Sequence, residues 1–199
     1  MYTQLVKNLL TISMSTILFF NLSYSQPFLA EEEGKTIIEK YSSKFPKFFR
    51  EFQYVSKNES KIKEFKFTRG NSNGTPAKAS KDGKIILDVS YLETTSNNDF
   101  DDNRLVIVLY HELGHLYYNS KNQNGNVEDN EKFAFEFSLK RAKDLAVKGD
   151  CGPLNTGMKF MQLRSLSNQL QDPHVRALKR IFNEPLIKSY AAFLKKICN

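Results

Sequence analysis

Apolar and polar positions recur with a helical period along most of the chain. Between residues 35 and 55, isoleucine and aromatic side chains return every three or four positions with lysines between them. This pattern predicts an amphipathic helix that is interrupted near Pro46. From residue 103 onward the same period predicts a succession of helices, at about 103–119, 127–148, 157–170, 173–182 and 185–197.

The region between these helices has the pattern of strands and turns. Phe65 and Phe67 alternate with polar residues and predict a short strand. Asp82-Gly83 predicts a turn, and the β-branched run from Lys84 to Tyr91 predicts a second strand. A polar loop from Thr94 to Asp102 follows, and its acidic end is suited to the start of a helix.

The first 25 residues have the layout of a secretory signal peptide. Lys7 is the only charge in this segment, and a moderately apolar run at 9–22 leads to Ser23-Tyr24-Ser25. We expect cleavage after Ser25, which leaves one domain over residues 26–199 in a secreted or periplasmic location. The alternative is an uncleaved membrane anchor, although polar residues dilute the apolar run. No stable membrane span is expected after processing.

Composition narrows the class of protein. The chain has 199 residues, of which 40% are hydrophobic and 26% charged, as in globular proteins. The net charge is +7, and residues 139–199 contain 12 Lys and Arg against 4 Asp and Glu. These basic residues form either solvated helix faces or a contact with an anionic surface. No nucleic-acid motif appears, so no nucleic-acid partner is expected.

Only two cysteines are present, Cys151 and Cys198. In an exported chain such a pair is expected to form a disulfide. The alternative is two free buried thiols.

One motif points to metal chemistry: His111-Glu112-Leu113-Gly114-His115. Residues four apart lie on one face of a helix, so the two histidines can chelate one ion while Glu112 projects toward a water. Glu112 is the only charged residue between Arg104 and Lys121, which predicts a buried helix. Gly114 suggests a close approach of another element. The alternative is two packed histidines without an ion.

Zinc at such a pair needs a third protein ligand, and the helix at 127–148 offers three candidates. On a helical wheel Glu131 lies in the centre of the apolar stripe, Glu128 lies at its edge, and Glu136 lies among lysines on the solvent side. A buried carboxylate requires a cation. We therefore expect Glu131 to be the ligand, with Glu128 second. The alternative for either residue is a carboxylate stabilised by the helix dipole.

These residues resemble the gluzincin-type zinc metallopeptidases, especially their minimal forms. The likeness covers His111 to His115 and the Glu-x-x-Ala formed by residues 131–134. It implies that the run from Ile85 to Tyr91 is the strand bordering the substrate cleft. In that family an Asp or Asn follows the ligand Glu by four residues, where this chain has Phe135, and the gap from His115 to Glu131 is short for the family.

The third histidine, His174, follows Asp172-Pro173, which read as the cap and first residue of a helix. It resembles the late histidine of several gluzincins that hydrogen-bonds the tetrahedral intermediate. The helix N-terminus disfavours the imidazolium, so a neutral ring is expected to donate. The alternative is an exposed surface histidine.

Pattern and resemblance together imply a zincin-like α+β fold, with a small antiparallel sheet packed on a buried active-site helix and additional C-terminal helices. They imply a Zn²⁺ ion held by His111, His115 and Glu131, with Glu112 and His174 as catalytic residues. The expected activity is hydrolysis of a peptide or protein substrate by a zinc-activated water, with Glu112 as general base. The alternative is a non-catalytic exported zinc-binding or interaction protein on the same scaffold.

Overall fold

The computed structural model describes residues 28–70, 74–94, 101–122 and 124–198. Eight helices and three strands lie within these ranges. In chain order they are α1 (Glu31–Lys40), α2 (Pro46–Asn58), β1 (Glu64–Thr68), β2 (Ala77–Ala79), β3 (Lys84–Asp88), α3 (Ser90–Glu93), α4 (Asp102–Lys121), α5 (Val127–Val147), α6 (Gly152–Ser165), α7 (Pro173–Phe182) and α8 (Pro185–Ile197).

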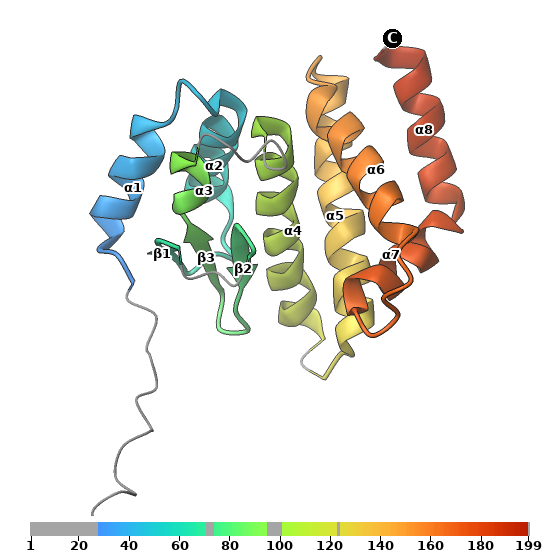
Figure 1. Ribbon diagram of the computed structural model, residues 1–199, viewed down its shortest axis with the longest axis horizontal. Helices are drawn as coiled ribbons and strands as arrows, with labels where there is room; N and C mark the ends of the chain where they lie inside the picture. Colours follow the sequence, from blue (N-terminus) through green and yellow to red (C-terminus); the bar gives the residue numbers. More distant parts are fainter. Residues whose placement is uncertain (1–27, 71–73, 95–100, 123, 199) are drawn as a thin grey trace, which may run out of the picture.

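Helix α4 forms the centre of the molecule. The sheet with α1, α2 and α3 lies on one side of it, and α5 to α8 lie on the other (Figure 1). Apolar side chains form a separate core on each side, and α4 contributes Leu109 and Leu113 to the first core and Ile107 to the second. The predicted burial of this helix is confirmed, because half of its 20 residues are buried.

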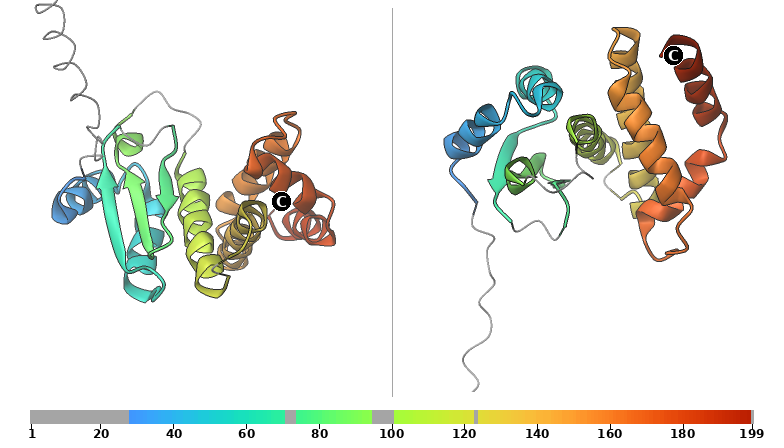
Figure 2. Two further views of the ribbon diagram at one scale, coloured as in Figure 1. Left: turned by 90° about the horizontal axis from the view of Figure 1, so that it is seen from below. Right: turned by 45° about the horizontal axis from the view of Figure 1, so that its top comes forward.

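The α+β class is confirmed, but the prediction of an antiparallel sheet is wrong. The strand order is β1-β3-β2, with β1 parallel to β3 and β2 antiparallel to it. The reason is that β3, the last strand in the chain, pairs with both earlier strands and so lies between them. The left-hand view of Figure 2 shows the three strands beside α4.

Strand β2 was not predicted. Its sequence is Ala-Lys-Ala, which has little intrinsic preference for a strand. The turn predicted at Asp82-Gly83 is confirmed, because Gly83 has a φ of 93° and joins β2 to β3. Part of the run predicted as strand after Asp88 forms the short helix α3 instead.

The predicted interruption at Pro46 is confirmed as a break between α1 and α2. Pro46 is the first residue of α2, where its missing N–H removes no helical hydrogen bond. The carboxylate of Asp102 accepts from the backbone N–H groups of Lys47 and Phe48, at 3.0 and 2.8 Å. The start of α4 therefore caps α2.

The C-terminal helices agree with the pattern except for α6. This helix begins at Gly152 and ends at Ser165, about five residues before the predicted range. Pro153 in its first turn and the fully buried Leu154 belong to the helix. Cys151 and Cys198 form a disulfide with Cα atoms 5.8 Å apart, so the predicted bridge is confirmed.

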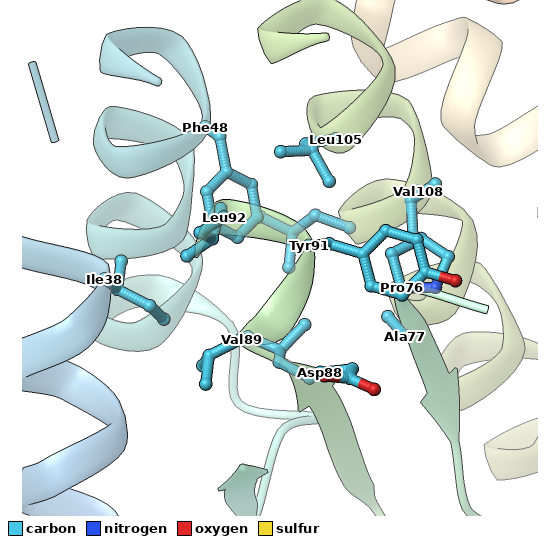
Figure 3. A pocket seen from close by; sticks show the side chains of 12 residues that line it. Ile38, Phe48, Pro76, Ala77, Asp88, Val89, Tyr91, Leu92, Leu105 and Val108 are labelled. Carbon is cyan, nitrogen blue, oxygen red and sulfur yellow. The ribbon is translucent and has the colours of Figure 1, made fainter. Parts of the chain in front are cut away.

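A small apolar cavity of about 20 Å³ lies between α2, α3, β3 and α4 (Figure 3). Val89, Leu92 and Leu105 line it, and it has room for about one water. Its one charged side chain, Asp88, already accepts hydrogen bonds from Gly70 and Ser90. We therefore assign it no ligand.

No helix in the described part of the chain is long and apolar enough to cross a membrane. The predicted signal peptide, residues 1–25, lies outside the described residues.

Candidate metal centre

Helix α4 brings the side chains of His111 and His115 together, with Glu112 between them in sequence, as the spacing predicts. His111 and Glu112 are buried, and the Nε2 atoms of the two histidines lie 3.1 Å apart. Both ring nitrogens thus point to the same space on the side of α4 that faces α5.

Helix α5 adds Glu131, the carboxylate that the helical wheel placed in the apolar stripe. Its Oε2 lies 3.3 Å from His111 Nε2 and 3.7 Å from His115 Nε2. The side chain can reach the histidines because α5 crosses α4 closely at Gly114. A Cβ atom at residue 114 would lie 2.7 Å from the Cα of Ala134. The close approach suggested by this glycine is therefore confirmed.

Glu128 and Glu136, the two other acids of α5 considered above as ligands, do not join the histidines. Glu128 accepts from Arg176 and Arg180 at 2.8 and 3.0 Å, and Glu136 pairs with Lys132 at 2.6 Å. Of the two expected ligands, the structure brings Glu131 and not Glu128 beside the histidines.

His174 lies at the start of α7 and also faces this cluster. Its Nε2 is 3.2 Å from Glu131 Oε2, and its Nδ1 is 2.9 Å from Asp172 Oδ1. Asp172 caps α7 and is itself held by Arg164 at 2.8 Å. The His174 side chain is 37% exposed, so it lies at the surface, but its Nε2 faces the cluster.

The contact with Asp172 bears on which His174 nitrogen carries a proton. A neutral ring that donates from Nδ1 to this carboxylate has no proton at Nε2. The expected neutral donor therefore does not fit the geometry: Nε2 either carries a lone pair toward the cluster or donates from a doubly protonated ring.

A supporting residue that sequence reasoning missed is Asn130. Its Oδ1 lies 2.8 Å from His115 Nδ1, and its Nδ2 donates to Asn119 Oδ1 at 3.1 Å. The second bond orients the amide so that its oxygen accepts from Nδ1–H, which leaves His115 Nε2 with a lone pair. The position beside Glu131 in sequence gave no signal of this role.

His111 has no such support within the described residues. Its Nδ1 is buried without a hydrogen-bond partner there. The ring packs instead on Phe135, with 4.4 Å between ring centroids. The gluzincin-type family that the sequence resembles has Asp or Asn at the position of Phe135. The departure from that pattern therefore lies next to the His111 nitrogen that lacks a partner among the described residues.

The donor atoms fit one metal ion. Tetrahedral zinc with ligand bonds near 2.0 Å has its ligand atoms about 3.3 Å apart. Glu131 Oε2 lies 3.2 to 3.7 Å from the Nε2 atoms of the three histidines, and the Nε2 atoms of His111 and His115 lie 3.1 Å apart. Glu131 Oε2 is buried and has no hydrogen-bond partner among the described residues, as expected of an oxygen that faces a cation. His111, Glu131 and His174 form a group that could bind a metal ion, and His111, Glu112 and His115 form another.

Burial sets the protonation of this cluster. It lowers the pKa of His111 and of His115, so both rings are neutral and can offer lone pairs near pH 7. Burial also raises the pKa of Glu112, although a hydrogen bond to the backbone of Ala79 opposes the shift. For Glu131, burial raises the pKa, but the nearby ring of His111 and the rings of His115 and His174 lower it further, to below its ordinary value.

The cluster forms the floor of a cleft of about 560 Å³. Residues 74–79 and 81, including strand β2, line one side, and Phe135, Phe160 and Arg164 line the other. The cleft is thus open to a ligand much larger than a metal ion.

No protein-family model, no curated protein and no solved structure matches this chain. Its function is therefore inferred from its own residues and their arrangement.

Proposed function

We propose that this protein is a zinc-dependent peptidase on a zincin-like variant of the α+β fold. The observation that carries the proposal is the meeting of His111, His115 and Glu131 from two helices around one space, with the buried Glu112 beside them. These residue types in this geometry suit zinc and a general base.

The cleft supports a peptide as substrate. Strand β2 is an edge strand of the sheet and lines the cleft. An edge strand offers backbone N–H and C=O groups that an extended peptide can pair with. Such pairing would hold the peptide over the cluster along α4.

The chemistry follows from the side chains. His111, His115 and Glu131 would hold a zinc ion, which when bound would supply Lewis-acid activation of a water and of the substrate carbonyl. Glu112 takes the proton from the attacking water and passes it to the nitrogen of the leaving amine, so that the peptide bond is hydrolysed without net uptake of protons. The raised pKa of Glu112 suits a base that must also act as an acid.

Glu131→Gln tests the metal ligand, with Glu136→Gln as its matched control, and Glu112→Gln tests the base. Glu131→Gln is expected to lose bound zinc, whereas Glu136→Gln on the solvent side of α5 keeps one zinc per chain by elemental analysis. Glu112→Gln is expected to keep zinc and lose cleavage of a quenched peptide library. Full activity in Glu112→Gln, or full zinc in Glu131→Gln, would overturn the proposal.

The position of His174 favours a second candidate, a non-catalytic protein with zinc held by four side chains. Its Nε2 lies 3.2 Å from Glu131 Oε2, and the Nε2 of His111 lies 3.3 Å from the same oxygen. Four protein ligands close the coordination sphere of a structural zinc site. In the peptidase, by contrast, His174 is held by Asp172 and acts on the substrate oxygen in the transition state.

His174→Ala separates the two functions. If His174 is a fourth ligand, its loss weakens zinc binding by about tenfold or more, and the wild-type protein cleaves no peptide. If His174 acts on the substrate, zinc affinity is unchanged and kcat falls about a hundredfold. Chelator competition and peptide cleavage on the same preparations measure both quantities.

We also propose that the chain is exported. The disulfide between Cys151 and Cys198 supports this, since such bonds persist in oxidising compartments. N-terminal sequencing of the protein isolated from its host tests the proposal. A chain that begins at Met1 would contradict cleavage after Ser25.

A further inference from the structure

A second recess adjoins the metal cleft at the C-terminal end of α4. It has a volume of about 490 Å³, and its walls are the loop before β1, the turn that joins β2 to β3, and the last turns of α4. The β2–β3 turn and the end of α4 lie at the same end of the molecule (Figure 1). The recess shares Lys81 and Asn119 with the cleft, so a ligand can extend from one space into the other.

Three exposed lysines supply the charge of this recess. Lys61 and Lys63 precede β1, and Lys81 lies in the β2–β3 turn. Among the described residues, none of the three has an ion-pair partner. The one acid that lines the recess, Asp82, is already paired with Lys84 at 2.7 Å. The recess therefore presents positive charge that no acid of its own balances.

The backbone holds the two loops of the recess together. The N–H of Lys63 donates to the carbonyl of Gly83 at 2.8 Å, which ties the loop before β1 to the β2–β3 turn. The stem of the Lys63 side chain packs over this turn, because a Cβ atom at residue 83 would lie 3.0 to 3.3 Å from its Cγ, Cδ and Cε. Lys63 and Lys81 therefore extend from one connected piece of backbone.

Strand β2 leads from the metal cluster to the recess. Ala77 and Ala79 line the cleft, and Lys81 follows Ala79 by two residues. A peptide paired with the edge of β2 would therefore leave the cleft at Lys81. On α4 the same exit lies at Asn119, one turn after His115 and about 6 Å along the helix. An extended peptide covers that distance in about two residues.

Asn119 adds a hydrogen-bond donor at this exit. Its Oδ1 accepts from Asn130 Nδ2 at 3.1 Å. The other group of the Asn119 amide is therefore the N–H donor Nδ2. A carboxylate is an acceptor that suits both this amide and the lysine ammonium groups.

We propose that Lys61, Lys63 and Lys81 bind an acidic segment of the substrate, about two or three residues from the bond that is cut. This inference rests on the proposed peptidase function. The carboxylates are either Glu and Asp side chains or the C-terminus of a short peptide, since all present the same two oxygens. Ammonium groups on flexible stems recognise charge more than shape, so Glu and Asp are expected to bind alike.

Peptide binding tests the inference without relying on catalysis. The probes are rhodamine-labelled short peptides that carry a pair of glutamates at successive positions, each matched by a peptide with a pair of glutamines there. They are titrated by fluorescence anisotropy into zinc-loaded protein carrying Glu112→Gln, which leaves the peptides uncut. The same peptides with free and amidated C-termini separate side-chain carboxylates from a terminal one.

We expect one position of the glutamate pair, or the free C-terminus, to tighten binding about tenfold over its neutral match at low salt. Added salt is expected to reduce this ratio, because the lysines are exposed and their charges are screened. Adding Lys61→Gln, Lys63→Gln and Lys81→Gln together is expected to bring the ratio close to one.

The matched control carries Lys159→Gln, Lys188→Gln and Lys196→Gln instead. These lysines are exposed on α6 and α8 and line neither the cleft nor the recess, so the control has the same net charge as the recess variant. Its ratio is expected to remain about tenfold, because the recess is intact.

Equal binding of acidic and neutral peptides, or a ratio that survives the loss of the three recess lysines, would overturn the inference. An equal loss in the control would also overturn it, since net charge alone would then explain the ratio. Cleavage of the probes by the wild-type protein tests the peptidase separately. An acidic preference without any cleavage would support the recess and overturn the peptidase proposal, whereas cleavage without an acidic preference would overturn the recess alone.

Discussion

Asn130 and Glu131 are neighbours in sequence but serve different parts of the metal cluster. Glu131 faces the histidines as the proposed ligand, whereas Asn130 contacts His115 Nδ1. Adjacent residues on a helix point about 100° apart, which lets one turn of α5 supply both a ligand and its support. This arrangement places the amide one residue before the carboxylate.

Asn130→Ala is expected to weaken zinc binding about tenfold to a hundredfold, because His115 loses the acceptor that orients its ring. Competition with a chelator of known zinc affinity measures the change. Asn155→Ala on the exposed surface of α6 is the control and should bind as the wild type does. Unchanged affinity in Asn130→Ala would show that the ring needs no partner.

The pKa shifts in the cluster predict how the metal-free protein responds to acid. His111 and His115 have pKa values below 6.5 when folded, so the unfolded chain binds more protons and the free energy of unfolding falls as pH drops below 6.5. Glu112, whose folded pKa is raised above 4.5, opposes this because the folded state binds its proton more tightly.

Glu112→Gln removes that opposing group. The variant, stripped of metal, should therefore lose stability more steeply than the wild type between pH 6.5 and 5. Urea unfolding at several pH values checks this. A parallel pH dependence in both proteins would mean that Glu112 titrates normally.

At single positions, sequence periodicity predicted which acid lies beside the histidines. It distinguished Glu131 from Glu128 and Glu136, because a carboxylate within an apolar stripe must be buried. It could not pair His174 with Glu131, since these residues are 43 positions apart and only tertiary packing joins them. The role of Asn130 was not predicted, because an asparagine near the start of a helix is usually exposed to solvent.

At the scale of elements, the crossing of α4 and α5 decides whether the site exists. Gly114 lets Ala134 approach, and Glu131 lies one turn before Ala134. Any displacement of α5 at this crossing also moves the carboxylate away from the histidines.

Gly114→Val is expected to lower the free energy of unfolding by about 2 kcal/mol or more, because the added atoms overlap the backbone of α5. Zinc affinity should fall with it. Ser120→Val, exposed on the same helix, introduces the same side chain without the overlap. Denaturant unfolding and chelator competition measure the two effects, and equal behaviour of both variants would contradict the role of the crossing.

Helices were more predictable than strands in this chain. A buried amphipathic stripe extends over many turns, so α5, α7 and α8 could be placed within about a residue. Strand β2 has three residues and owes its conformation to pairing with β3. Local preference is a weak guide to such a segment.

For the whole molecule, the disulfide joins the ends of the C-terminal region. It connects Cys151 before α6 with Cys198 after α8, with a sequence separation of 47. The apolar core among α5 to α8 lies within or against the loop that the bridge closes.

Replacing both cysteines by serine is expected to lower the free energy of unfolding by about 4 kcal/mol, because the unfolded chain regains the freedom of a long loop. Zinc stoichiometry at 25 °C should stay at one per chain, since core packing still holds α7. Chemical denaturation and elemental analysis check both. A stability equal to that of the wild type would mean that the core alone fixes α8.

The order of the strands could not be obtained from the sequence. Three short strands can be arranged in several ways with the same alternation, and the position of β3 between β1 and β2 is set by its pairing with both. The sequence predicted most helices and two of the strands but not the order of the strands, because that order depends on contacts between segments that are apart in the chain.

The atoms proposed to bind an ion come from α4, α5 and α7, at positions 111 to 174. During synthesis, a chain of which only α4 has emerged contains two of these histidines and none of the other proposed ligands. If the proposed function is right, hydrolytic activity would therefore begin only after the last third of the polypeptide has emerged and docked on α4.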